Sequence, residues 1–168
     1  MAQGLPADGS RVMGGGRVTT SQFDFSNDQW ELVARVPVLV GMAVARAEDS
    51  GFLGSFKETR ALMGAIAAEA DQRPAGSLIA QAATTDTAGR FEQYRETDSA
   101  VLAADAVDAC RQLADVLAAV AEPDEAEGYK RWVLDVARAV AGAAKEHGVR
   151  VSAGEEAVIA GVEAALGL

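Results

Sequence analysis

The chain has 168 residues and a mass of 17.4 kDa, which suits one domain that buries roughly two-thirds of the surface of its unfolded chain. Fifteen Lys and Arg against 25 Asp and Glu give a formal net charge of −10, which argues against binding nucleic acid as the main function. A single Cys excludes an intramolecular disulfide and a zinc ribbon, and a single His excludes any site that needs two imidazoles.

The composition predicts a helical protein. The chain contains 36 Ala and only 4 Pro, and Ala loses no side-chain entropy when it enters a helix. The longest apolar run, from Val36 to Ala45, would cover about 15 Å as a helix, half the thickness of the bilayer core. We therefore expect this run to be a buried helix, and we expect a cytoplasmic protein without membrane insertion, since residues 1–20 lack the apolar core of a secretory signal.

Residues 1–25 contain Gly14, Gly15 and Gly16 without helical periodicity, and we expect a flexible N-terminal tail there. Within it, Phe23-Asp24-Phe25 precedes a predicted helix start at Ser26 or Asn27. These aromatic residues are interpreted as a hydrophobic staple that folds back onto the helix, the alternative being a short docking motif. Pro37 lies inside the helical pattern and is expected to kink the helix or to divide it in two.

The remaining helices follow from caps and breakers. Ser55 to Glu58 is a capping box that opens a helix to about Asp71, and residues 77–84 form a short helix. Residues 85–97 are a loop or a marginal helix. Asp98 or Ser99 caps a long helix to Ala121, Pro123 opens another to about Glu146, and residues 152–155 form a second capping box. Residues 26–168 are therefore predicted to form a single all-α bundle of six or seven helices.

An internal repeat is predicted from a shift of 97 residues, which superposes residues 36–68 on residues 133–165. The aligned pairs include Gly51 with Gly148, Ser55 with Ser152 and Glu58 with Glu155, so that loop glycines and helix caps match. Two helix–loop–helix units, at about residues 27–72 and 124–167, would then make up the bundle.

The segment from Arg46 to Gly51, followed by Glu58, resembles the Ala-Asp-Gly, polar loop and Glu signature of TerB-like tellurite-resistance domains and their bacterial relatives. These are compact all-helical proteins whose acidic loops are proposed to bind a metal ion. The resemblance and the repeat together single out four candidate metal ligands: Asp49, Glu58, Glu146 and Glu155.

Carboxylate oxygens suit hard cations such as Ca²⁺ or Mg²⁺, which need several converging ligands, although the spacing here is not that of an EF-hand. The alternative is that Glu58 and Glu155 complete their capping boxes, while Asp49 and Glu146 are solvated loop residues. No other cofactor is indicated.

The remaining residues of interest are expected to have structural roles or to lie on the surface. His147 has no recognisable nucleophile beside it, and Cys110 is expected to be a small buried thiol. Trp30 and Trp132 are expected to anchor the core or its edge. Asp98, Asp105, Asp108 and Asp115 recur along one face of the long helix, as a solvated band or as a surface for a basic partner.

The sequence carries no phosphate-binding loop, nucleophile elbow, dinucleotide fingerprint or zinc spacing, so it does not predict an enzyme. We expect a non-enzymatic interaction or stress-response module of the TerB-like kind, with an acidic cation site at the paired loops. The alternative is an adaptor without a ligand that binds another protein through its N-terminal tail and acidic helical face. In both interpretations the expected partner is a protein.

Overall fold

The computed structural model describes residues 19–47, 56–74, 76–145 and 151–168, and this part of the chain contains seven α-helices, one 3-10 turn and no strand. The prediction of an all-α bundle of six or seven helices is confirmed. The elements in chain order are η1 (Gln22–Asp24), α1 (Asn27–Ala45), α2 (Phe56–Asp71), α3 (Leu78–Ala83), α4 (Thr87–Tyr94), α5 (Ser99–Val120), α6 (Pro123–Lys145) and α7 (Ala153–Leu166).

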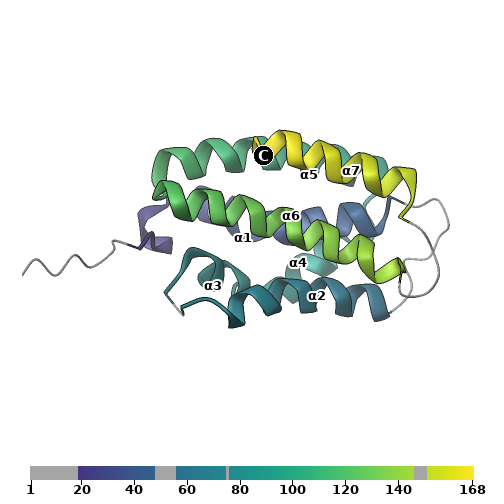
Figure 1. Ribbon diagram of the computed structural model, residues 1–168, viewed down its shortest axis with the longest axis horizontal. Helices are drawn as coiled ribbons and strands as arrows, with labels where there is room; N and C mark the ends of the chain where they lie inside the picture. The colour runs from purple at the N-terminus through teal and green to yellow at the C-terminus, as the bar shows by residue number, and fades with distance from the viewer. Residues whose placement is uncertain (1–18, 48–55, 75, 146–150) are drawn as a thin grey trace, which may run out of the picture.

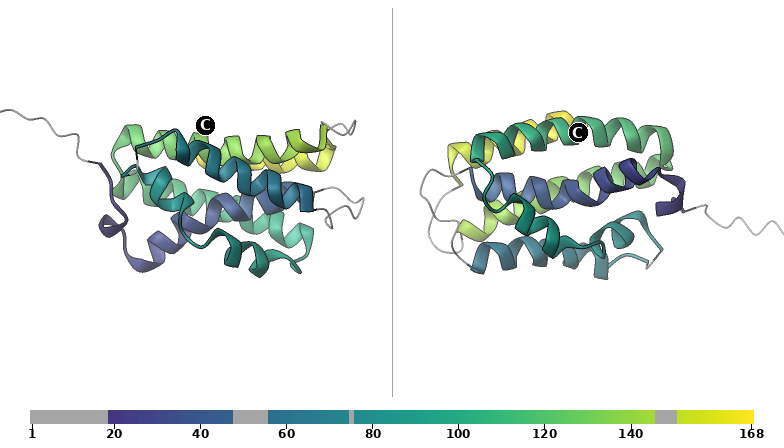
Figure 2. Two further views of the ribbon diagram at one scale, coloured as in Figure 1. Left: turned by 90° about the horizontal axis from the view of Figure 1, so that it is seen from below. Right: turned by 180° about the vertical axis from the view of Figure 1, so that it is seen from behind.

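Helix α1 is the centre of the bundle. It packs against each of the other six helices, with α5 and α7 on one side and α2, α3 and α4 on the other (Figure 1). The views from below and behind show α4 crossing beside α1 (Figure 2). From Leu32 to Val44 every residue of α1 except Arg35 is buried. The prediction that the apolar run from Val36 is a buried helix is confirmed.

The start of α1 is fixed by a cap and a staple. Ser26 accepts a hydrogen bond from the Gln29 backbone N–H, and the Gln29 side chain accepts one from the Ser26 N–H, which makes a capping box. Phe25 is buried and its ring lies 5.9 Å from that of Trp30, centroid to centroid. These two positions flank the cap as a hydrophobic staple requires, so this interpretation is confirmed, whereas Phe23 is 86% exposed.

Pro37 does not divide α1, because the helix continues from Asn27 to Ala45. A proline has no N–H, so the carbonyl of Val33, four residues earlier, loses its helical partner. The hydroxyl of Tyr129 in α6 donates a hydrogen bond to that carbonyl at 2.7 Å, and both groups are buried. The fold thus supplies from another helix the donor that the proline removes.

The starts of α3, α5 and α6 agree with the sequence predictions, whereas Ser55, the cap expected for α2, lies outside the described residues. Ser77 caps α3, Asp98 caps α5 with bonds to two backbone N–H groups, and Pro123 opens α6. Residues 85–97, for which a loop and a marginal helix were both considered, contain α4. Trp132 is buried in the core beside Tyr129, and Trp30 lies at the core's edge, as expected.

The ends of α1 and α7 meet at one end of the bundle. The backbone carbonyl of Ala47 lies so close to Gly154 that a Cβ atom there would overlap it, so only glycine fits at this contact. The helix pairs α1–α2 and α6–α7 each contain the segments matched by the predicted repeat, but the arrangement does not establish a duplication, which stays a prediction. Within the described residues no helix is long and apolar enough to span a bilayer.

Candidate functional site

The four candidate metal ligands are only partly placed by the structure. Asp49 and Glu146 lie outside the described residues, and Glu58 belongs to α2 but its side chain is not described. No group of three or more His, Cys, Asp or Glu side chains suited to a metal ion occurs in the ranges that the structure describes. A cation site at the paired loops therefore stays a prediction.

Glu155 is the one candidate whose side chain is described, and it caps a helix. It is 5% exposed, its carboxylate accepts a hydrogen bond from the Ser152 N–H at 2.7 Å, and its own N–H donates to the Ser152 hydroxyl at 3.1 Å. The capping box predicted for this half of the chain is confirmed.

The structure places some of the other side chains that the sequence singled out. Cys110 is buried in the core, and the loss of water around it raises the pKa of the thiol to about 12. Asp105, Asp108 and Asp115 are exposed on α5, which agrees both with a solvated band and with a surface for a basic partner. His147 lies outside the described residues.

An ion pair that the sequence did not indicate joins α4 to α1. Arg90 donates two hydrogen bonds to the carboxylate of Glu31, one of them at 2.8 Å, and the Arg90 side chain is only 11% exposed. The hydrogen bond from Arg90, aided by its charge, holds the pKa of Glu31 below its usual value against the opposing effect of burial. This pair fixes α4 against the central helix.

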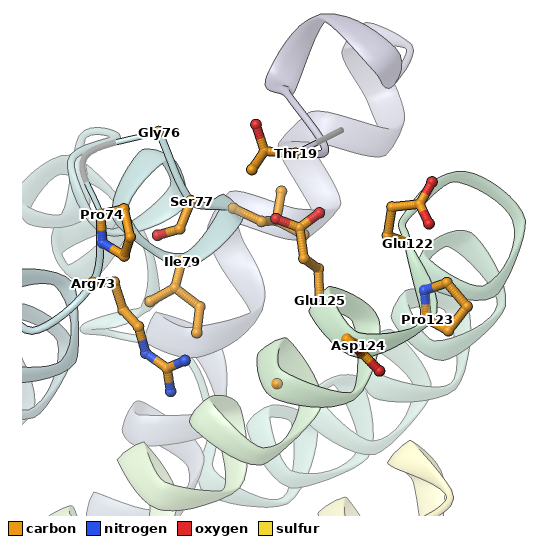
Figure 3. A pocket seen from close by; sticks show the side chains of 12 residues that line it. Thr19, Arg73, Pro74, Gly76, Ser77, Ile79, Glu122, Pro123, Asp124 and Glu125 are labelled. Atoms are coloured by element: carbon orange, nitrogen blue, oxygen red, sulfur yellow. The ribbon is translucent and has the colours of Figure 1, made fainter. Parts of the chain in front are cut away.

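A groove of about 770 Å³ lies between α3 and the start of α6. It is lined by Thr19, by Arg73, Pro74 and residues 76–79, and by residues 122–125 with Gly128. Figure 3 shows Ile79 between Arg73 on one wall and Glu125 on the other. We refer to it below as the α3–α6 groove.

The groove follows from local breaks in the chain. Pro74 and Gly76 lie in the turn between α2 and α3, and Pro123 starts α6 at the opposite rim. Leu78 and Ile79 are buried at its floor. Gly128 has open space where a side chain would be, since an added Cβ atom would meet nothing within 4 Å. The groove therefore has buried apolar side chains at its floor and is open where α6 lacks a side chain.

The segment before η1 borders the groove at Thr19 and is bound to the bundle through Thr20. The Thr20 N–H donates to the Glu125 carboxylate at 2.7 Å, and the Thr20 hydroxyl accepts from the backbone N–H of Glu122 at 3.1 Å. Its carbonyl accepts from the Gln81 side chain at 3.3 Å, and Thr20 itself is 4% exposed. The described part of the expected tail, residues 19–25, is thus packed on the bundle.

A second hollow of about 450 Å³ continues from the groove along α6 and shares Arg73, Asp124 and Gly128 with it. Five carboxylates line the two hollows together, against two arginines. The acidic residues are Glu122, Asp124, Glu125, Glu127 and Asp135, and the basic ones are Arg73 and Arg131. The surface around the groove therefore carries an excess of negative charge.

Sequence reasoning did not find this groove. Its walls come from segments about fifty to one hundred residues apart, and the bond between Thr20 and Glu125 joins positions 105 residues apart. The signals present were the breakers Pro74, Gly76 and Pro123, which indicated where helices end but not which ends would meet.

Comparison with protein-family models, with curated proteins and with solved structures found no match to this chain.

Proposed function

We propose that the protein is a non-enzymatic interaction module that binds another protein in the α3–α6 groove. The observation that carries this proposal is the groove itself: a hollow of about 770 Å³ with Leu78 and Ile79 at its floor. Its volume lies in the range of clefts that hold small molecules, so it can take a side chain of a partner protein.

The groove is held in a defined shape. Thr20 connects the segment before η1 to the first turn of α6, and Gln81 of α3 bonds to Thr20 and to the Gly76 carbonyl at 2.8 Å. A wall fixed by hydrogen bonds lowers the entropy lost on binding, because fewer groups must be ordered when the partner arrives.

As expected from the sequence, the proposed partner is another protein. The proposed contact surface is different. The alternative drawn from the sequence used the N-terminal tail and the acidic face of α5. The groove instead brings together the end of the tail, at Thr19, with α3 and α6. The stress-response character and the cation site implied by the TerB-like resemblance stay predictions, which native mass spectrometry with added Ca²⁺ or Mg²⁺ would test.

The test is photo-crosslinking in cells that produce the protein. A photoreactive amino acid at Gly76, on the rim, should give adducts of discrete mass, and the same amino acid at Gly64 should not. Both glycines have open space for a side chain, and Gly64 lies on α2 outside the groove. Adding Gly128→Trp should remove the adducts by filling the groove.

Equal adducts at Gly76 and Gly64, or adducts at Gly76 that persist with Gly128→Trp, would refute binding in the groove. Gly142→Trp serves as the matched control for the blocking substitution. It lies on the same helix, about 21 Å further along at 1.5 Å per residue, and also has open space.

A further inference from the structure

The charges around the α3–α6 groove discriminate between kinds of partner. The N-terminus of α6 contributes a partial positive charge of about half a unit, which is too small to reverse the excess of three carboxylates over arginines. The residues that line the two hollows therefore carry a net negative charge.

Some of these carboxylates already form hydrogen bonds or ion pairs within the protein, and others do not. Glu125 is bound to the Thr20 N–H, and Glu127 forms ion pairs with Lys130 and Arg131. By contrast, the carboxylate of Asp124 has no hydrogen-bond or ion-pair partner among the described residues, and it borders both hollows. It is thus available to a cationic group brought by a ligand.

The apolar floor and the acidic wall lie next to each other. Ile79 and Leu78 form the floor, Pro74 and Pro123 border it, and Asp124 follows Pro123 directly at the rim. A ligand that fills the floor with an apolar side chain would place its neighbouring residue at the rim to which Pro123 and Asp124 belong.

We propose that the occupant of the groove is a segment of a partner protein with a bulky apolar side chain next to a Lys or Arg. This inference rests on the proposed function and specifies the chemistry of the partner. The apolar side chain binds over Leu78 and Ile79, and the cation lies against Asp124. Attraction between the basic segment and this acidic protein also speeds their encounter at low salt.

Selection from a random peptide display library, with the full-length protein as the target, tests the inference. Peptides are kept only if they bind the wild-type chain and Gly142→Trp but fail to bind Gly128→Trp. Their sequences are then compared with the unselected library for apolar residues beside Lys or Arg.

Enrichment of an apolar residue beside Lys or Arg is the expected result. Groove-dependent peptides that are acidic or uncharged would overturn the inference while leaving groove binding intact. If no peptide is lost with Gly128→Trp, the proposed function fails as well.

Measured affinities give a second, independent test with a selected peptide that carries a fluorescent label. Asp124→Asn should weaken binding about two- to fivefold, as expected for one exposed ion pair, and more at low salt than at high salt. Asp105→Asn removes the same charge from exposed α5 and should leave the affinity unchanged. Equal effects of the two substitutions would mean that only the net charge matters, which would overturn the contact with Asp124.

Discussion

The hydrogen bond between Tyr129 and Val33 predicts an unusual coupling between a tyrosine and a proline on different helices. Tyr129→Phe removes only the hydroxyl and leaves the Val33 carbonyl, orphaned by Pro37, without a donor in the core. A buried carbonyl left unsatisfied costs about 1–3 kcal/mol in the free energy of unfolding. In a domain of this size each kcal/mol lowers the melting temperature by about 2–4 °C.

The same substitution in a Pro37→Ala background should cost much less. An alanine in place of the proline brings back the backbone N–H that the Val33 carbonyl normally receives within a helix, so the tyrosine hydroxyl is no longer needed. The coupling is measured as a double-mutant cycle by urea unfolding of the four proteins. An equal cost of Tyr129→Phe in both backgrounds would refute this account of how α1 accommodates its proline.

Tyr94 provides a matched control for the loss of a buried hydroxyl. It is 7% exposed, and its hydroxyl has no hydrogen-bond partner in the described part of the chain. Tyr94→Phe should therefore leave stability unchanged or raise it, since a buried polar group without a partner is destabilising. A loss as large as that of Tyr129→Phe would show that the cost is not specific to the bond with Val33.

Two further predictions concern titratable groups. Because burial raises the pKa of Cys110 to about 12, only about one thiol in ten thousand is ionised at pH 8, and a thiol reagent should react slowly with the folded protein but rapidly in denaturant. Glu31→Gln should lower the melting temperature at pH 7 by an amount that shrinks on acidification. Since Arg90 lowers the pKa of Glu31 in the folded state, the stabilisation is present above the unfolded value of about 4.3 and is lost as the pH falls through the folded value.

The size of the Glu31 effect is limited because its side chain is 56% exposed, so about 1 kcal/mol is the upper bound expected. A difference between wild type and Glu31→Gln that stays constant from pH 7 to pH 3 would contradict the assignment. For Cys110, rapid labelling of the native protein would show that the helix around it opens readily.

Much of the fold could be predicted from the sequence because helix starts and stops depend on neighbouring residues. Ser26, Asp98 and Ser152 cap their helices through side chains that reach backbone N–H groups two or three residues away. The staple between Phe25 and Trp30 is equally local. The long apolar run from Val36 to Ala45 likewise predicted a buried helix, and residues 36–44 of α1 are buried.

The segment before α1 is a case in which neighbouring residues did not predict the structure. Glycines and the lack of periodicity predicted a tail through residue 25, yet Thr20 is buried by bonds to Gln81, Glu122 and Glu125. All three partners are more than 60 residues from Thr20 in the sequence. Its burial depends on α3 and α6 meeting beside it, and only the packing of the bundle brings them there.

The sequence by itself determined most of the helices, the caps at Ser26, Asp98 and Ser152, and the buried run at the centre of the bundle, because these depend on interactions within a few residues and on apolar periodicity. The tertiary structure alone decided the donor for the Val33 carbonyl, the pairing of Arg90 with Glu31 and the α3–α6 groove. Each of these joins segments from different helices. Their geometry depends on how helices pack around α1, which the order of residues along any one helix does not specify.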